Sequence, residues 1–220
     1  MVRPMKRVLI TGVGRCGTLA ISDSFGRIAR HESVDEFRKV SRDRFDDRTG
    51  AHSRGFETSI GIFDSWYSKG HLIECSCFAW NCVDLIAERD TQIAFVNITR
   101  DKEPSVKSML RTPLYMKGGW PFQERCMKGF RDFNESGYSQ ADRRFNCERV
   151  WDIRTEGIRK GLEAVPDHRQ LTVDFVDMVN GDGWNEMKQF IGEWLKMDLG
   201  HMPLKNHPHR GNRKYWGPIE

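Results

Sequence analysis

The most informative segment for the fold is Lys6-Arg-Val-Leu-Ile-Thr-Gly-Val-Gly-Arg-Cys-Gly-Thr18. Residues 6–11 form a short, β-branched apolar run that ends in glycine, which is typical of a buried parallel strand. Residues 12–17 predict a tight loop, and the apolar side chains that recur after Thr18 predict a helix. A strand, a glycine loop and a helix in this order present backbone N–H groups at a helix N-terminus, where an anion binds favourably.

Strand-like and helical patterns alternate along the rest of the chain. Further strands are expected at 60–63, 71–74, 92–99 and 171–173, and further helices at 78–89, 102–110, 122–133, 142–164 and 184–195. This alternation predicts an α/β fold, a single domain over residues 1–220 with a central, mainly parallel sheet flanked by helices. The polar segment 38–58 is expected to be a flexible insertion, and 200–220 an irregular basic tail.

Charge and hydropathy limit the classes of partner. The net charge of +4 is too small to indicate nucleic acid, but it suits a small polyanionic ligand bound by converging cations. No apolar run approaches the ~18 residues of a membrane span, and residues 8–10 are too short for a signal-peptide core. We therefore expect a cytoplasmic protein without a nucleic-acid or membrane partner.

The cysteines predict neither a disulfide framework nor a metal site. The six cysteines lack the dense spacing of a secreted disulfide scaffold. Cys75, Cys77, Cys82 and the nearby His71 could begin a metal site, but no second ligand pair with the usual spacing completes four ligands. Reduced, mostly buried thiols and no metal are the expectation.

The glycine loop by itself is compatible with more than one nucleotide. Residues 12–17 match G-x-G-x-x-G, and Glu32 or Asp35 lies near the distance of a ribose-binding acid, so a dinucleotide-binding Rossmann domain is one candidate. A Walker A loop is excluded, because no Lys-Ser/Thr pair follows the glycines. A third interpretation of the loop accounts for Arg15 and Thr18 as well as for the glycines.

Arg15-Cys-Gly-Thr18 resembles the 5′-phosphosulfate loop of the sulfotransferases that use 3′-phosphoadenosine 5′-phosphosulfate (PAPS). The resemblance implies that the Arg15 side chain faces the sulfuryl group. It also implies that the 5′ end of the cofactor is held by Gly14, Arg15, Cys16, Gly17, Thr18 and Leu19. Cys16 stands where the family usually has Ser, and Leu19 where it often has a second Thr, so each departure removes one hydroxyl contact.

A second match lies after the strand at 93–99. Arg100 follows this strand and Ser108 comes eight positions later on the next helix, as in the pair that binds the 3′-phosphate in sulfotransferases. Residues 171–179 are similar to a segment often written R-Y-E-D-L in the family, and Trp151 lies where bacterial members tend to have a Trp. Arg210 and Arg213 resemble a basic segment that closes over the 3′-phosphate. The resemblance covers about residues 6–195 and is dense only at the two cofactor motifs.

The family resemblance implies in-line transfer of a sulfuryl group from PAPS to an acceptor hydroxyl or amine, with release of 3′-phosphoadenosine 5′-phosphate (PAP). Such a transfer depends on positioning and on cationic groups, here Arg15 and, within a K-x-H-L match, Lys69. Two residues could accept the proton of the acceptor, Glu32 and His71, and Glu32 is narrowly favoured.

Two other functions remain open on the sequence. The first is an NAD(P)-dependent oxidoreductase, motivated by the G-x-G-x-x-G match, and the second is a catalytically degenerate nucleotide-binding module, motivated by Cys16 and Leu19. For a sulfotransferase, the acceptor would be a small molecule or a glycan, bound by variable loops at about 38–58 and 111–140.

Overall fold

A parallel sheet forms the centre of the molecule. The computed structural model describes residues 5–31, 70–77, 79–111 and 139–205. The strands of these residues pair side by side in the order β2-β3-β1-β4-β5, and every pair is parallel. Their bounds are β1 Arg7–Gly12, β2 Ala29–His31, β3 Ile73–Cys75, β4 Ile93–Thr99 and β5 Gln170–Asp174. The predicted α/β fold with a mainly parallel sheet flanked by helices is confirmed.

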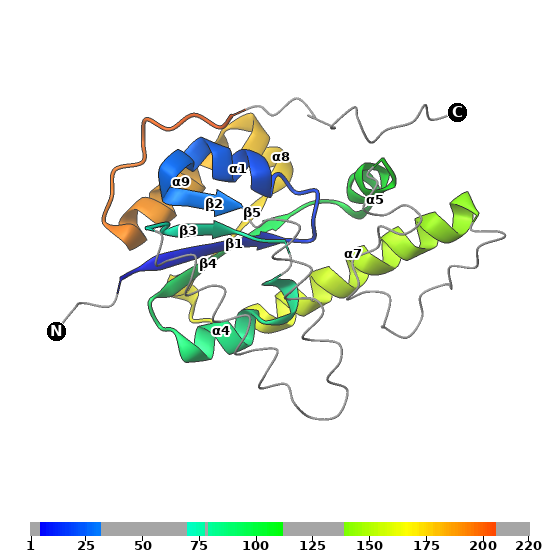
Figure 1. Cartoon of the computed structure of the whole chain (residues 1–220), viewed down its shortest axis with the longest axis horizontal. Helices are drawn as coiled ribbons and strands as arrows, with labels where there is room; N and C mark the ends of the chain where they lie inside the picture. Colours follow the sequence, from blue (N-terminus) through cyan, green and yellow to red (C-terminus); the bar gives the residue numbers. More distant parts are fainter. Residues whose placement is uncertain (1–4, 32–69, 78, 112–138, 206–220) are drawn as a thin grey trace.

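Helices cover both faces of this sheet, with α1 and α9 on one face and α4 and α7 on the other (Figure 1). The helix bounds are α1 Thr18–Phe25, α4 Val83–Arg89, α5 Lys102–Leu110, α7 Gln140–Leu162, α8 Phe175–Asn180 and α9 Asp182–Leu195. Three short 3₁₀ turns complete the described elements, η1 Gly26–Ile28, η2 Ala79–Asn81 and η4 Asp167–Arg169. None of the described helices is both long enough and apolar enough to cross a bilayer.

The first strand carries consecutive apolar residues because both of its faces are covered. In β1, Val8 and Ile10 pack in the cluster with α1 and α9, whereas Leu9 packs in the cluster with α4 and α7. All three side chains are fully buried. Burial of an aliphatic side chain of this size stabilises the fold by about 1.5–3 kcal/mol. The run at residues 8–10 therefore specifies a strand at the centre of the sheet.

The direction of the strand connections reverses between β1 and β4. The chain leaves β1 for β2 and β3 on one side of it, and later enters β4 and β5 on the other side. Connections that diverge in this way leave room for a ligand beyond the carboxyl ends of the two strands. Gly12, the last residue of β1, pairs with Ile98 of β4, so the glycine loop and Arg100 both follow at this edge.

The strongest periodic segments occur where the sequence predicts them. The first strand, the strand at 93–99 and the helix at 102–110 agree with the prediction to within one residue. The strand predicted at 71–74 lies slightly later, at Ile73–Cys75. The long helix starts at Gln140 because Ser139 and Asp142 form a capping box, with Asp142 N–H donating to Ser139 Oγ at 3.1 Å.

Strand β2 is missed by sequence patterns, because its three residues are too few to show a period of two. Helix α8 follows β5 without a break, as expected from the resemblance of residues 171–179 to a strand-to-helix segment. The first part of the predicted basic tail is attached to the fold, because Lys205 N–H donates to Ser24 Oγ at 2.7 Å and the Trp184 indole donates to the Met202 carbonyl at 2.9 Å. The insertion at 38–58, the strand at 60–63 and the helix at 122–133 lie outside the described residues.

Candidate functional site

The glycine loop has a backbone that most side chains would not tolerate. Gly14, Arg15 and Gly17 have φ values of 91°, 60° and 85°, in the left-handed region. At Gly17 a Cβ would also lie 3.1 Å from the Phe175 ring, which explains why glycine stands there. No side chain caps the N-terminus of α1 and its first turn holds no acidic residue. The first N–H groups of this helix therefore face no competing negative group of their own helix.

Arg100 packs directly against this loop. Its Nη1 donates to the carbonyl of Arg15, and its guanidinium lies 4.3 Å from the centre of the Phe175 ring. The Trp151 indole in turn donates to the Arg100 carbonyl at 3.1 Å. Burial lowers the pKa of Arg100, Cys16 opposes this, and the Arg15 cation adds to the decrease. An arginine nevertheless stays charged. Within the described part of the chain, no carboxylate pairs with Arg100.

The two predicted anion-binding motifs are in direct contact. Arg15 Nε donates to Ser108 Oγ at 3.1 Å, across 93 positions of the chain. Ser108 lies on α5, the helix that follows Arg100. The loop after β1 and the Arg-Ser pair after β4 thus lie side by side at the carboxyl edge of the sheet.

The two positions where the loop departs from the family motif behave differently. The Cys16 side chain is fully buried in the core cluster on the α1 side of the sheet. Burial raises the pKa of its thiol, while the N–H groups of Gly14 and Cys16 and the cations Arg154 and Arg100 oppose this rise. The thiol is therefore part of the core, and Cys16 can offer a ligand only its backbone. Leu19 is 52% exposed on the first turn of α1.

His31 is a site residue that the motifs do not reveal. It ends β2 at the same edge as the loop, and its Nε2 lies 3.1 Å from Thr18 Oγ1. The sequence gives only a weak signal for His31. It directly precedes the base candidate Glu32, but it belongs to no motif with a characteristic spacing. Glu32, the next residue in the chain, lies outside the described residues.

Arg154 also escapes motif analysis. Its side chain is fully buried on α7, and Nη1 donates to the carbonyl of Val13 in the loop at 3.2 Å. The sequence does hold a signal for it. Arg154 lies at helical spacing between Val150 and Ile158, which are buried on the same helix, and a charge on an apolar stripe is unusual.

His71 is not near the loop, and this corrects its assignment as a candidate base. Ile73 pairs with Val8 near the start of β1, so His71 lies beyond the amino end of β3, at the opposite edge from the loop. Its Nδ1 is 3.2 Å from the Arg27 carbonyl, before β2. The K-x-H-L match is thus a local coincidence in this fold. Its partner Lys69, with Arg210 and Arg213, lies outside the described residues.

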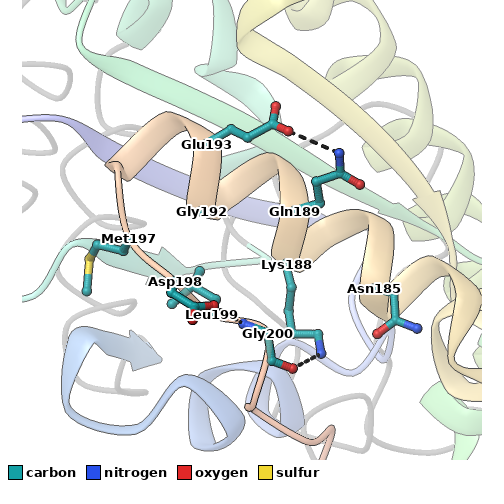
Figure 2. A pocket seen from close by; sticks show the side chains of 9 residues that line it. All are labelled: Asn185, Lys188, Gln189, Gly192, Glu193, Met197, Asp198, Leu199 and Gly200. Carbon is teal, nitrogen blue, oxygen red and sulfur yellow. Dashed lines mark hydrogen bonds between the residues drawn. The ribbon is translucent and has the colours of Figure 1, made fainter.

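A surface hollow of about 400 Å³ lies away from all these groups. It is lined by α9 and by residues 197–200, and Figure 2 shows the hydrogen bond from Lys188 to the Gly200 carbonyl beside it, 2.9 Å long. The Trp194 indole, at the end of α9, donates to the carbonyl of Arg7 at 2.9 Å, which places this end of the helix at the amino edge. In the described ranges, no group of three or more His, Cys, Asp or Glu residues is placed to hold a metal ion.

Comparison with known proteins supports the fold through solved structures. No family model and no curated protein sequence matches the chain. Solved structures do. A sulfotransferase from Alicyclobacillus acidocaldarius matches with a TM-score of 0.58 at 12% identity, over 93% of this chain and 87% of its own. The sulfotransferase domain of the curacin biosynthetic pathway has a TM-score of 0.55 at 10% identity, and the match covers 89% of this chain and 75% of that one. The sulfotransferase domain of the Synechococcus PCC 7002 olefin synthase has a TM-score of 0.52 at 12% identity, and the match covers 89% of this chain and 74% of that one. The chain has the sulfotransferase fold.

Proposed function

We propose that this protein is a PAPS-dependent sulfotransferase, which transfers a sulfuryl group to an acceptor hydroxyl or amine and releases PAP. The observation that carries the proposal is the contact between the two anion-binding motifs, through Arg15 Nε and Ser108 Oγ and through Arg100 and the Arg15 carbonyl. A nucleotide with charged groups at both its 5′ and 3′ ends needs two such sites within one molecule's length. A singly phosphorylated ligand does not.

The residues present fit such a ligand. The N–H groups at the start of α1 suit the 5′-phosphosulfate, since a helix N-terminus without an acidic residue favours an anion. Arg100 and Ser108 suit the 3′-phosphate, because a guanidinium without a carboxylate partner in the described residues can give charged hydrogen bonds to phosphate oxygens. The Arg100 guanidinium also packs over the Phe175 ring, which limits the rotamers that binding must order.

PAPS, when bound, supplies the sulfuryl group that is transferred. Arg15 is proposed to balance the negative charge that develops on the sulfuryl and phosphate oxygens, as a cation does in phosphoryl transfer. Glu32 is the remaining base candidate, because it follows His31 directly and β2 ends at the edge of the loop. A base there would take the proton of the acceptor group.

The sheet order argues against the oxidoreductase alternative. In a dinucleotide-binding Rossmann domain, the strand after the first helix lies beside the first strand. Here both neighbours of β1 are other strands, β3 and β4, and β2 pairs only with β3 among the described strands. The degenerate-module alternative is weaker than the sequence suggests at Cys16, because a side chain buried in the core removes no ligand contact.

Thermal melting with three nucleotides tests the proposal. PAP should raise the melting temperature strongly, whereas NAD and ATP should raise it little, since ligand binding to the native state stabilises it. Arg100→Ala should lose most of the PAP shift, and Arg159→Ala, which removes an arginine paired with Glu156 on the exposed face of α7, should keep it. A shift with NAD alone would contradict the proposal.

A single-turnover assay with labelled PAPS separates an active enzyme from a degenerate module. Sulfated product from any member of a panel of hydroxyl and amine acceptors, small molecules and glycans, supports catalysis. Glu32→Gln should then abolish product while PAP binding persists. PAP binding without any product, in wild type and with every acceptor class, would favour the degenerate module.

A further inference from the structure

Arg154 is a buried cation placed directly behind the phosphate loop. Its side chain has no solvent exposure. It extends from α7 to the carbonyl of Val13, the residue after the carboxyl end of β1, which is itself 4% exposed. A buried guanidinium is costly because it loses its hydration. Its charge also acts on the loop interior, since it opposes the rise in the pKa of the buried Cys16 thiol.

The hydrogen bond to Val13 fixes the direction of a peptide in the loop. Peptides in the described residues are trans, so the Val13 carbonyl and the Gly14 N–H point in opposite directions. Arg154 draws the carbonyl towards α7, so the Gly14 N–H faces the other way, towards the buried Cys16 thiol, and the start of the loop is tied to the core. The next residue pair is held in a similar way, because Arg100 binds the carbonyl of Arg15 and so orients the N–H of Cys16.

These two anchors act on a backbone that would not hold its shape easily. Gly14 and Arg15 are consecutive left-handed residues, and a non-glycine residue in this region is strained. Without an anchor on each carbonyl, the loop could relax to other conformations, and the N–H groups at the start of α1, which follow it, would lose their position. One anchor, Arg100, directly follows β4, and the other, Arg154, lies on α7.

We infer that Arg154 is a positioning residue for the 5′-phosphosulfate site, which holds the loop through the Val13 carbonyl and adds positive charge behind it without touching the ligand. The inference rests on the proposed function, because it assigns the ligand's 5′ end to this loop. The 3′-phosphate site, at Arg100 and Ser108, should not depend on Arg154 in the same way.

The experiment compares two ligands that differ only at the 5′ end. Calorimetric affinities are measured for PAP and for adenosine 3′-phosphate, with full-length wild type, Arg154→Met, Arg154→Lys and the control Arg169→Met. Arg169 is a matched control, since it is also buried and also donates to backbone carbonyls, but at the amino edge. Melting temperatures of all four proteins are recorded alongside.

Arg154→Met should weaken PAP about tenfold or more and adenosine 3′-phosphate less than about twofold, since only the 5′ site loses its preorganised donors. Arg154→Lys should lie between wild type and Arg154→Met, because the charge remains but the planar fork is lost. Arg169→Met should melt at a lower temperature and keep both affinities within about twofold of wild type.

Equal losses for both ligands, or no loss for either, would overturn the inference, because a general packing defect does not distinguish the two ends. A loss of PAP selectivity in Arg169→Met as large as in Arg154→Met would overturn it too. If Arg154→Met does not fold, Arg154→Lys decides by the same criterion. Wild type that binds PAP no more tightly than adenosine 3′-phosphate would instead overturn the proposed function, and the inference with it.

Discussion

At both edges of the sheet a buried arginine donates hydrogen bonds to backbone carbonyls, but the charges around the arginines differ between the two edges. At the amino edge, Arg169 is 5% exposed and donates to the carbonyls of Ile93, at 3.0 Å, and Asp90, at 2.7 Å. Burial lowers the pKa of Arg169, and the Asp90 carboxylate opposes the decrease. Asp90 also lies 3.8 Å from Arg7. The cations at this edge are accompanied by a negative charge.

At the carboxyl edge the arginines bind carbonyls of the glycine loop. Arg154 donates to Val13 and Arg100 to Arg15, and no carboxylate in the described ranges pairs with Arg100. The same type of side chain binds the same type of acceptor at both edges, but Arg100 has no carboxylate partner in the described residues. A cation without such a partner favours a nearby anion, which is why we propose that the ligand binds at the carboxyl edge.

The largest expected effect comes from Gly12, where the loop leaves β1. A Cβ there would lie 2.4 Å from Cys16 Sγ and 2.7 Å from the Ile98 carbonyl oxygen, which is backbone and cannot turn away. Gly12→Ala should lower the free energy of unfolding by about 3 kcal/mol, measured by urea denaturation. Gly200→Ala is the control, since its φ lies outside the positive range that disfavours side chains and a Cβ there meets only the flexible Asp198 carboxylate, at 3.3 Å, so a loss below about 1 kcal/mol is expected. Equal losses in the two variants would show that the loop is not tightly packed.

Removal of the structural arginine at the amino edge should come next. Arg169→Met leaves the carbonyls of Ile93 and Asp90 without this donor, and should lower the free energy of unfolding by about 2 kcal/mol. Chemical denaturation with and without saturating PAP measures the loss of stability and the stabilisation by PAP. The stabilisation by PAP should be the same as in wild type. A reduced PAP effect would mean that the amino edge also shapes the ligand site, and the contrast between the edges would break down.

Two tryptophans offer a finer comparison, because each donates its indole N–H to an arginine carbonyl. Trp151 binds the carbonyl of Arg100 at 3.1 Å, and Trp194 binds that of Arg7 at 2.9 Å. Replacement of either by Phe removes one hydrogen bond and should cost about 1 kcal/mol of stability. Only Trp151→Phe should also weaken PAP binding, by a few-fold, because it loosens Arg100. Unchanged PAP affinity in Trp151→Phe would argue that Arg100 is positioned by Phe175 and Arg15 alone.

The smallest effect is expected on the exposed face of α7, which provides a baseline for charge pairs outside both edges. Hydrogen bonds from Arg159 and Lys160 lower the pKa of Glu156 from 4.5 to about 2. A carboxyl group with a lowered pKa stabilises the folded state above its unfolded value, so this contribution is complete above pH 4.5 and is lost as the pH falls towards 2. Glu156→Gln should melt slightly below wild type at pH 7, and the difference should shrink through that window. A difference that grows on acidification would contradict the assignment.

The predictable part of the site consists of short segments whose side chains are neighbours in the chain. The glycines, Arg15 and Thr18 lie within one turn of a strand end, and Arg100 and Ser108 lie within one strand-to-helix unit. The match at His71 has the same local form, but the structure places this residue at the opposite edge of the sheet from the loop. A local motif does not tell at which edge of the sheet it lies, because that depends on how its strand pairs with the neighbouring strands. For His71, the register of β3 with β1 decides the edge.

Two strand-to-helix units can be predicted from the sequence. In the first, a buried strand is followed by a glycine loop and a helix, and in the second, the strand at 93–99 places Arg100 just before another helix. Apolar periodicity and glycine conformation are properties of a few consecutive residues, which is why these units can be read directly. Only the tertiary structure decided that Arg15 meets Ser108 across 93 positions, that Arg154 supports the loop from α7, and that His71 lies at the far edge. Those facts depend on strand order and on the packing of α7 beneath the sheet, which bring distant residues together and are set by burial over the whole fold.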